Sequence, residues 1–253
     1  MLSDLVGAMA TYGLLDRAEQ IARTITNPYH LGRALGDLAA IMANSGQLDR
    51  AQQLAEHAER AAHTITDPYD RARELSDLVT TFAECGLLDR AERIARTITL
   101  PDRQAHALSK LAAAMLKCGR LDRAQQLAEH AERAAHTITD PDRQTRALGD
   151  LAATMVKCGQ LDRAEHIAHH AEQAARTITD PDEHAWVLSD LVTTFAKCGL
   201  LDRAEHVTRT ITSPYHPDGA LNDLATAFAE CGNPDRADNA PAPSPTPTIE
   251  HAL

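Results

Sequence analysis

Apolar residues recur along the chain with the spacing of helices that bury one face. Between residues 75 and 82 they are separated by three, one and three positions, which matches the 3.6-residue period of an amphipathic helix. The stripe ends before Gly86, and glycine is common just beyond a helix C-terminus. A second stripe begins at Leu88 and runs to Ile98. The pattern predicts two helices joined by a tight turn at Gly86.

The same two-helix pattern extends over nearly the whole chain. The motif Gly-x-Leu-Asp-Arg-Ala recurs at separations of 33 and 40 residues, and its last copy is degenerate. A second motif, Thr-Ile-Thr-x-Pro, closes six of the units; proline suits the first helical position, and the Asn, Asp or Ser before it in five copies can cap a helix. Such periods indicate stacked helical hairpins. The motif glycines are Gly13, Gly46, Gly86, Gly119, Gly159, Gly199 and Gly232.

The two period lengths predict two lengths of second helix. The difference of seven residues is about two helical turns, which returns the apolar stripe to nearly the same face. The longer helices are expected in the units of Gly46, Gly119 and Gly159. A stripe of small residues on the first of them permits close helix contact; it consists of Ala51, Ala55, Ala58 and Ala62.

Charge and segment composition narrow the function classes. With 25 basic and 36 acidic side chains the net charge is -11, which disfavours a nucleic-acid partner. No apolar run reaches the roughly 18 residues of a membrane span, and the N-terminus lacks the basic segment of a signal peptide. We therefore expect a cytoplasmic protein without a membrane partner. Residues 1-233 are expected to form the repeat region and residues 234-253 an extended, proline-rich tail.

Both ends of the repeat region depart from the pattern. Leu2 to Leu5 align with Leu75 to Leu78, so the first helix is expected to lack about two turns, and the last repeat is incomplete after Gly232. Terminal repeats usually carry a polar outer face. The two explanations are a natural protein that is longer at its N-terminus and end-to-end self-association through the open ends.

The repeat resembles the tetratricopeptide-repeat family over roughly residues 1 to 232. Gly86 aligns with the family's inter-helix glycine, and Ala91 with its small position in the second helix. The large positions of the first helix align with Leu75, Leu78, Val79 and Phe82. The resemblance implies an all-α, right-handed α-solenoid of about six to seven helix-turn-helix repeats. The periods of 33 and 40, in place of the family's 34, and the replacement of its helix tryptophan and tyrosine by aliphatic residues or Phe depart from the pattern.

The residues that suggest catalysis are better explained by the repeat. The Asp-Arg dipeptide occurs in every unit, so we interpret it as a helix start and a source of ion pairs between units. Five cysteines occupy one repeat position, at separations of 33 or 40 residues, and are interpreted as small, buried, reduced packing residues. No glycine-rich phosphate loop follows a strand. The sequence predicts no enzyme activity and no cofactor.

A histidine triplet is the weak candidate for a metal site. His166, His169 and His170 have the i, i+3, i+4 spacing, and an i, i+4 histidine pair can chelate a metal ion. The equivalent positions of another long unit are Gln126, Glu129 and His130. An exposed, histidine-rich polar face is the favoured interpretation, so no metal site is predicted.

The resemblance implies a binding surface on the first helices, which line the concave face of such solenoids. We call the ten residues at these positions the first-helix row: Arg33, Asp37, Arg73, Asp77, His106, Lys110, Arg146, Asp150, Trp186 and Asp190. Arg73 and Asp77 are expected to pair, and Trp186 is the single aromatic anchor. The sequence favours a non-enzymatic scaffold that binds a protein or peptide. The alternative is a regulatory or sensor arm of a larger signalling protein such as an NTPase.

Overall fold

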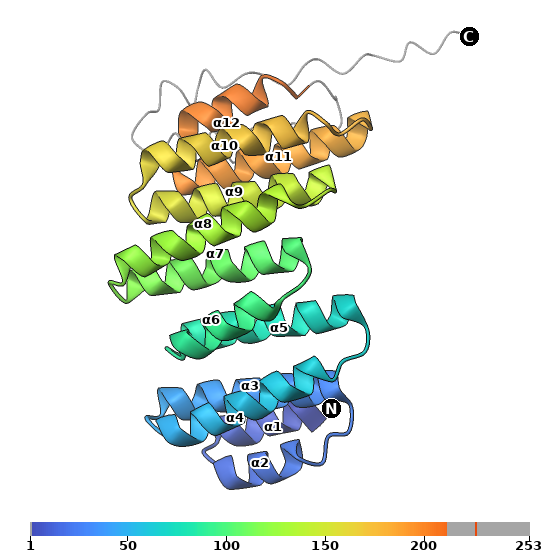
Figure 1. Ribbon diagram of the computed structural model, residues 1–253, viewed down its shortest axis with the longest axis vertical. Helices are drawn as coiled ribbons and strands as arrows, with labels where there is room; N and C mark the ends of the chain where they lie inside the picture. Colours follow the sequence, from blue (N-terminus) through green and yellow to red (C-terminus); the bar gives the residue numbers. More distant parts are fainter. Residues whose placement is uncertain (1, 212–225, 227–253) are drawn as a thin grey trace, which may run out of the picture. The chain divides into compact units, whose positions relative to one another are not determined.

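The described part of the chain is built from helical hairpins. The computed structural model describes residues 2–211 and residue 226, and this part holds twelve α-helices and no strand (Figure 1). The helices are α1 Leu2–Thr11, α2 Leu15–Ala22, α3 Pro28–Asn44, α4 Leu48–His63, α5 Pro68–Glu84, α6 Leu88–Thr97, α7 Pro101–Lys117, α8 Leu121–His136, α9 Pro141–Lys157, α10 Leu161–Ala175, α11 Pro181–Cys198 and α12 Leu201–Thr208. The predicted all-α repeat fold is confirmed. None of these helices is both long and apolar enough to cross a membrane.

The hairpins form two compact units, which we describe separately. Residues 1–137 form the first unit, and the second begins at residue 138. In the first unit α1, α3, α5 and α7 pack side by side in chain order, and the second helix of each hairpin also packs against the first helix of the next (Figure 1). In the second unit α9 packs against α10 and α11, and α12 packs against α10 and α11. The predicted tail, 234–253, and the predicted incomplete last repeat lie outside the described residues.

The helix boundaries follow the two sequence motifs. Each first helix from α3 to α11 begins at the motif proline, and the side chain before it caps four of these five helices. The Asp67 carboxylate, for example, accepts a hydrogen bond from the Asp70 amide at 2.8 Å. The connecting turn requires a positive φ, which is 85° at Gly86 and which glycine adopts without a Cβ clash. The predicted starts and turns are therefore confirmed for the described hairpins.

The two repeat lengths correspond to two lengths of second helix, as predicted. Helices α4 and α8 have 16 residues and α10 has 15, whereas α6 has 10 and both α2 and α12 have 8. The extra turns continue the buried face: Ala51, Ala55, Ala58 and Ala62 all lie fully buried along α4. Side chains this small allow neighbouring helices to approach closely.

Neighbouring first helices interlock through a glycine and a leucine. A Cβ built on Gly36 of α3 would lie 2.5 Å from Cδ2 of Leu78 on α5. In the second unit, a Cβ on Gly149 of α9 would lie 2.9 Å from Cδ1 of Leu191 on α11. Both leucines are buried. At these two junctions the later hairpin thus inserts a leucine into space that the glycine of the preceding hairpin leaves open.

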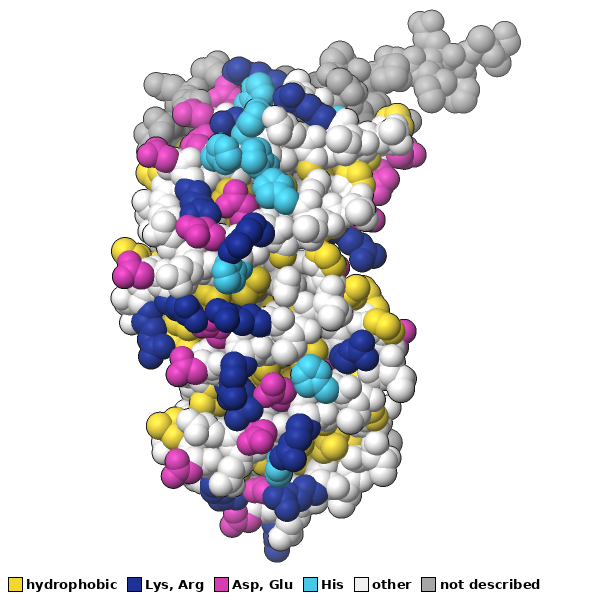
Figure 2. Space-filling model, in the orientation of Figure 1, with side chains coloured by type: hydrophobic (Ala, Val, Ile, Leu, Met, Phe, Trp, Pro, Cys, Tyr) yellow, Lys and Arg dark blue, Asp and Glu magenta, His cyan; other side chains and the backbone are white. Residues whose placement is uncertain are grey.

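The arginines of the Asp-Arg motif form ion pairs between successive hairpins, as interpreted from the sequence. In the first unit Arg50 contacts Asp16 at 2.7 Å and Arg90 contacts Glu59 at 2.8 Å. In the second unit Arg203 contacts Glu165 at 2.6 Å. Figure 2 shows acidic and basic side chains next to one another over α4 and α6. The motif aspartates lie in the first turns of the second helices, where negative charge is favourable.

The prediction that the cysteines are buried is wrong. Cys118 is exposed and the other three described cysteines are half-buried, all as free thiols. They lie at the C-terminal ends of the first helices, and the thiol of Cys198 donates a weak hydrogen bond to the Phe195 carbonyl at 3.3 Å. Ser45 does the same at the equivalent position, donating to Met42 at 2.9 Å. The repeat position therefore serves a helix end rather than the core.

Candidate binding surface on the first helices

A groove lies between α9 and α11 in the second unit. Its volume is about 320 Å³. The two helices supply both polar and apolar lining side chains. The lining residues are Thr145, Arg146, Gly149, Asp150, Val187, Asp190, Leu191, Thr193 and Thr194. The groove therefore brings together three members of the first-helix row with residues that sequence analysis did not select.

Arg146 and Trp186 form an exposed pair at this surface. The Arg146 guanidinium carbon lies 4.2 Å from the centroid of the Trp186 ring, a cation–π contact. Arg146 also bonds Asp142 at 2.7 Å and approaches Asp190 at 3.6 Å. These contacts hold the arginine against the ring while 45% of Trp186 stays exposed. An exposed, laterally supported indole is the type of side chain that anchors protein partners.

The floor of the groove is apolar and tightly packed. Val187 and Leu191 are almost fully buried, and Gly149 lets Leu191 come close to the α9 backbone. The Thr145 hydroxyl donates to the Pro141 carbonyl at 2.7 Å, within its own helix. The surface combines an apolar floor, an exposed indole and the carboxylates of Asp150 and Asp190.

The first unit places the rest of the first-helix row on α3, α5 and α7. Arg33, Arg73, Asp37 and Asp77 are exposed there. The expected pairing is wrong, because Arg73 and Asp77 form no ion pair within 4.0 Å among the side chains that the structure describes. These four charges instead act electrostatically on the buried carboxyl group of Glu74. His106 and Lys110 occupy the same positions on α7.

Glu74 was not predicted as a candidate site residue from the sequence. This residue is only 1% exposed, and its Oε2 has no hydrogen-bond partner. Burial, followed by the negative charge of Asp77, raises the pKa of the Glu74 carboxyl to about 7. Partial burial also raises the pKa of Asp37, an effect that the charge of Arg33 opposes. The available signal was that α3, α7, α9 and α11 carry Ala or Val at the repeat position that Glu74 occupies on α5.

The predicted histidine triplet lies on α10, where Figure 2 shows histidines gathered at the surface. The rings of His166 and His170 have centroids 4.4 Å apart, so the i, i+4 pair is formed. His169 instead contacts Gln173 at 3.0 Å and approaches the Glu172 carboxylate at 4.0 Å. The three rings therefore do not converge on one point.

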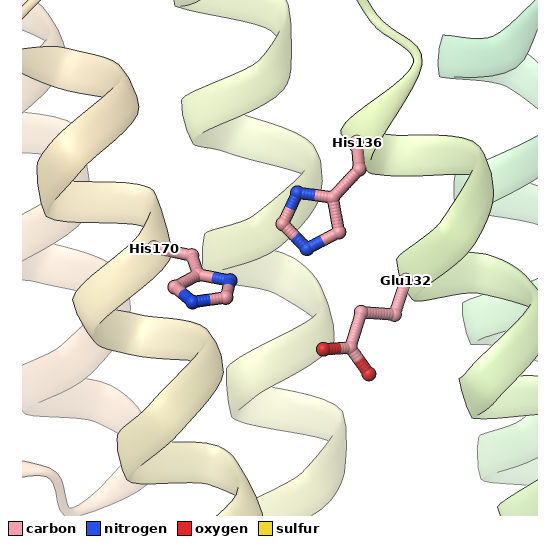
Figure 3. A group of neighbouring side chains, drawn as sticks. All are labelled: Glu132, His136 and His170. Carbon is pink, nitrogen blue, oxygen red and sulfur yellow. The ribbon is translucent and has the colours of Figure 1, made fainter.

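A second pair of potential ligands lies in the first unit. Glu132 and His136 project from the same side of α8, one turn apart (Figure 3). Figure 3 also labels His170, which belongs to α10 in the second unit. Within the first unit Glu132 and His136 provide two potential ligands, whereas structural zinc sites use four.

Comparisons with known proteins identify no family. No family model matches the chain, and no curated protein matches its sequence. Among solved structures, it is similar to Ton1535 from Thermococcus onnurineus NA1, with 15% identity, a TM-score of 0.39, and coverage of 89% of this chain and 90% of that one. BtubC (BKLC) from P. vanneervenii matches with 16% identity, a TM-score of 0.41 and coverage of 100% and 98%.

A circular tandem repeat protein with a novel repeat topology and enhanced subunit contact surfaces also matches. Its identity is 15%, its TM-score is 0.29, and the match covers 94% of this chain and 54% of that one.

Proposed function

We propose that the chain is a non-enzymatic, tetratricopeptide-like scaffold that binds an extended peptide segment of a partner protein. The exposed Trp186, supported by Arg146 beside the α9–α11 groove, carries this proposal. Partner proteins commonly bind through a few exposed aromatic and arginine side chains beside apolar pockets. Val187 and Leu191 supply the apolar contact of this groove.

The charges of the groove favour a peptide with basic side chains. Asp150 and Asp190 line it, and the one basic lining residue, Arg146, is already engaged by Asp142 and Asp190. The chain as a whole carries a net charge of -11, which also attracts a basic partner. We therefore infer a peptide that places an apolar side chain on the groove floor and a Lys or Arg side chain beside the aspartates.

The affinity of basic and acidic peptides tests this function. Two fluorescein-labelled peptide pools of equal length would be compared by fluorescence polarisation, one rich in Lys and apolar residues and one rich in Glu and apolar residues. We expect the basic pool to bind more tightly. Trp186→Ala should weaken that binding roughly 30-fold, because removing an aromatic anchor costs about 2 kcal/mol.

Arg176→Ala is the matched control, because Arg176 is an exposed arginine of the same unit at the end of α10. It should leave the affinity unchanged, whereas Arg146→Ala should weaken binding by releasing the indole. Equal binding of the two pools, or equal affinity of wild type and Trp186→Ala, would contradict the proposal.

A further inference from the structure

Glu74 and Gly32 form a pair that occurs at one hairpin junction of the described chain. Glu74 lies on α5 where the other first helices carry Ala34, Ala107, Ala147 and Val187. Gly32 lies on α3 where the others carry Ala72, Ala105, Thr145 and Ala185. A charged side chain and a glycine thus replace two small or aliphatic residues that face each other between neighbouring first helices.

The glycine provides the space that the glutamate occupies. A Cβ built on Gly32 would lie 3.0 Å from Oε1 of Glu74 and 3.6 Å from the Ala58 carbonyl oxygen of α4. The carboxyl group therefore lies against the α3 backbone, inside the packing of α3, α4 and α5. A methyl group in place of the Gly32 hydrogen would force the carboxyl to shift.

Ionisation of this carboxyl is unfavourable at this position. Its Oε2 is buried without a hydrogen-bond partner, and a buried charge without a partner is strongly unfavourable. The charged groups that act on it are Arg33 and Asp37 from α3, and Arg73 and Asp77 from α5. The two aspartates oppose a further negative charge, and the two arginines favour it. On the other side of α5, helix α7 carries His106 and Lys110 in the corresponding row.

We propose that protonation of Glu74 controls whether the packing between α3 and α5 is closed or open. The helices close over the neutral carboxyl. When Glu74 loses its proton to solvent, the charged carboxylate is stable only if the junction opens enough to admit water or to bring Arg33 or Arg73 into contact with it. Because Arg33, Asp37, Arg73 and Asp77 all lie at this junction, its opening also rearranges the first-helix row of the first unit.

The direction of the pH dependence follows from proton linkage. The pKa of Glu74 is about 7 in the closed junction, against 4.5 for a solvated glutamate. The closed form therefore holds its proton where the open form has lost it, and closure is most favourable below pH 4.5. From well below pH 4.5 to well above pH 7 the opening equilibrium constant rises about 300-fold in total; the rise is up to tenfold per pH unit between these two values and levels off above pH 7.

Hydrogen exchange of the full chain tests this proposal. Amide exchange rates in α3 and α5 would be measured by mass spectrometry from pH 4.5 to 8 and corrected for the intrinsic pH dependence of exchange. Wild type, Glu74→Gln and Glu84→Gln would be compared. Glu84→Gln is the matched control, because Glu84 is an exposed glutamate at the end of the same helix.

We expect protection of α3 and α5 to fall with rising pH in wild type and in Glu84→Gln, but to stay nearly constant in Glu74→Gln. Glu74→Ala, which restores the residue of other repeats, should behave as Glu74→Gln does. The same pH profile in wild type and Glu74→Gln would overturn the proposal, and so would a carboxyl pKa near 4.5 for Glu74, measured by NMR of its side-chain carbon in the folded chain.

A substitution cycle adds a test that does not depend on pH. Gly32→Ala should reduce protection of the junction in the wild-type background, where the new methyl meets the carboxyl. In the Glu74→Ala background the same change should preserve or increase protection, because alanine is then accommodated as in the other repeats. An equal effect of Gly32→Ala in both backgrounds would show that Glu74 does not occupy the space over Gly32. That result would refute the proposal that Glu74 controls opening of the junction.

Discussion

Gly36→Ala tests whether successive first helices interlock as described. The added methyl would lie 2.5 Å from Cδ2 of Leu78, well inside a van der Waals contact. Leu78 is buried, so its side chain has little space into which it can move. Overpacking of this kind costs about 1–3 kcal/mol, and the higher helix propensity of alanine returns about 1 kcal/mol. We expect a net loss of stability of about 0–2 kcal/mol.

Gly7→Ala is the matched control for helix propensity. Gly7 is also a helical glycine of a first helix, but a Cβ built on it meets nothing within 4 Å. This variant should gain about 0.4–1 kcal/mol. The difference between the two variants in the free energy of unfolding therefore isolates the contact with Leu78. We expect this difference to be about 1–3 kcal/mol.

The free energy of unfolding of both variants is obtained from urea titrations that are monitored by the circular dichroism of the helices. A second substitution sharpens the result: in a Leu78→Val background the Cδ atoms are absent, so Gly36→Ala should cost less than in wild type. If Gly36→Ala stabilises the chain as much as Gly7→Ala does, then Leu78 does not pack against Gly36 and the interlocking of α3 with α5 is wrong.

Three further predictions concern the ion pairs, the cysteines and the helix caps. Arg203→Ala should destabilise the chain by about 1–3 kcal/mol in urea unfolding, because it removes an arginine partner 3.4 Å from Glu172, a side chain that is only 4% exposed. Arg209→Ala breaks an exposed ion pair with Glu205 and should cost about 0.5 kcal/mol or less. Equal losses of stability in the two variants would contradict this reasoning. Iodoacetamide should label exposed Cys118 before Cys85 and Cys198 in peptide-resolved mass spectrometry, because burial raises the pKa of those two thiols; earlier labelling of Cys85 would refute it. Asp67→Ala should lower stability by about 1 kcal/mol through loss of the α5 cap, and an unchanged urea midpoint would show that the cap is not formed.

The helical hairpins were predictable because their signals are local. Proline at the first helical position, a capping side chain before it and glycine at the turn each act within a few residues, so they fix a helix end wherever the motif occurs. The lengthened second helices followed from the seven-residue difference between repeats, which preserves the apolar face. The ion pairs of Arg50, Arg90 and Arg203 followed from the recurrence of one dipeptide.

The parts that were not predictable depend on contacts between repeats. Periodicity places Val187 and Leu191 on a buried face, but it does not show that they form the floor of a groove beside Trp186. The spacing of Arg73 and Asp77 permits an ion pair, yet both charges act on the buried Glu74 instead. The cysteines were misassigned because an apolar residue type at a regular position suggests the core, whereas their position is a helix end.

The most direct test of the proposed binding function uses the indole signal of Trp186. The chain contains one tryptophan, so a sample labelled with ¹⁵N-tryptophan gives a single indole N–H resonance that reports on the edge of the α9–α11 groove. We predict that titration with the basic peptide pool shifts this resonance in wild type, with saturation at the concentrations where polarisation shows binding. Binding of the pool without any change in the indole resonance would place the contact elsewhere and contradict the account.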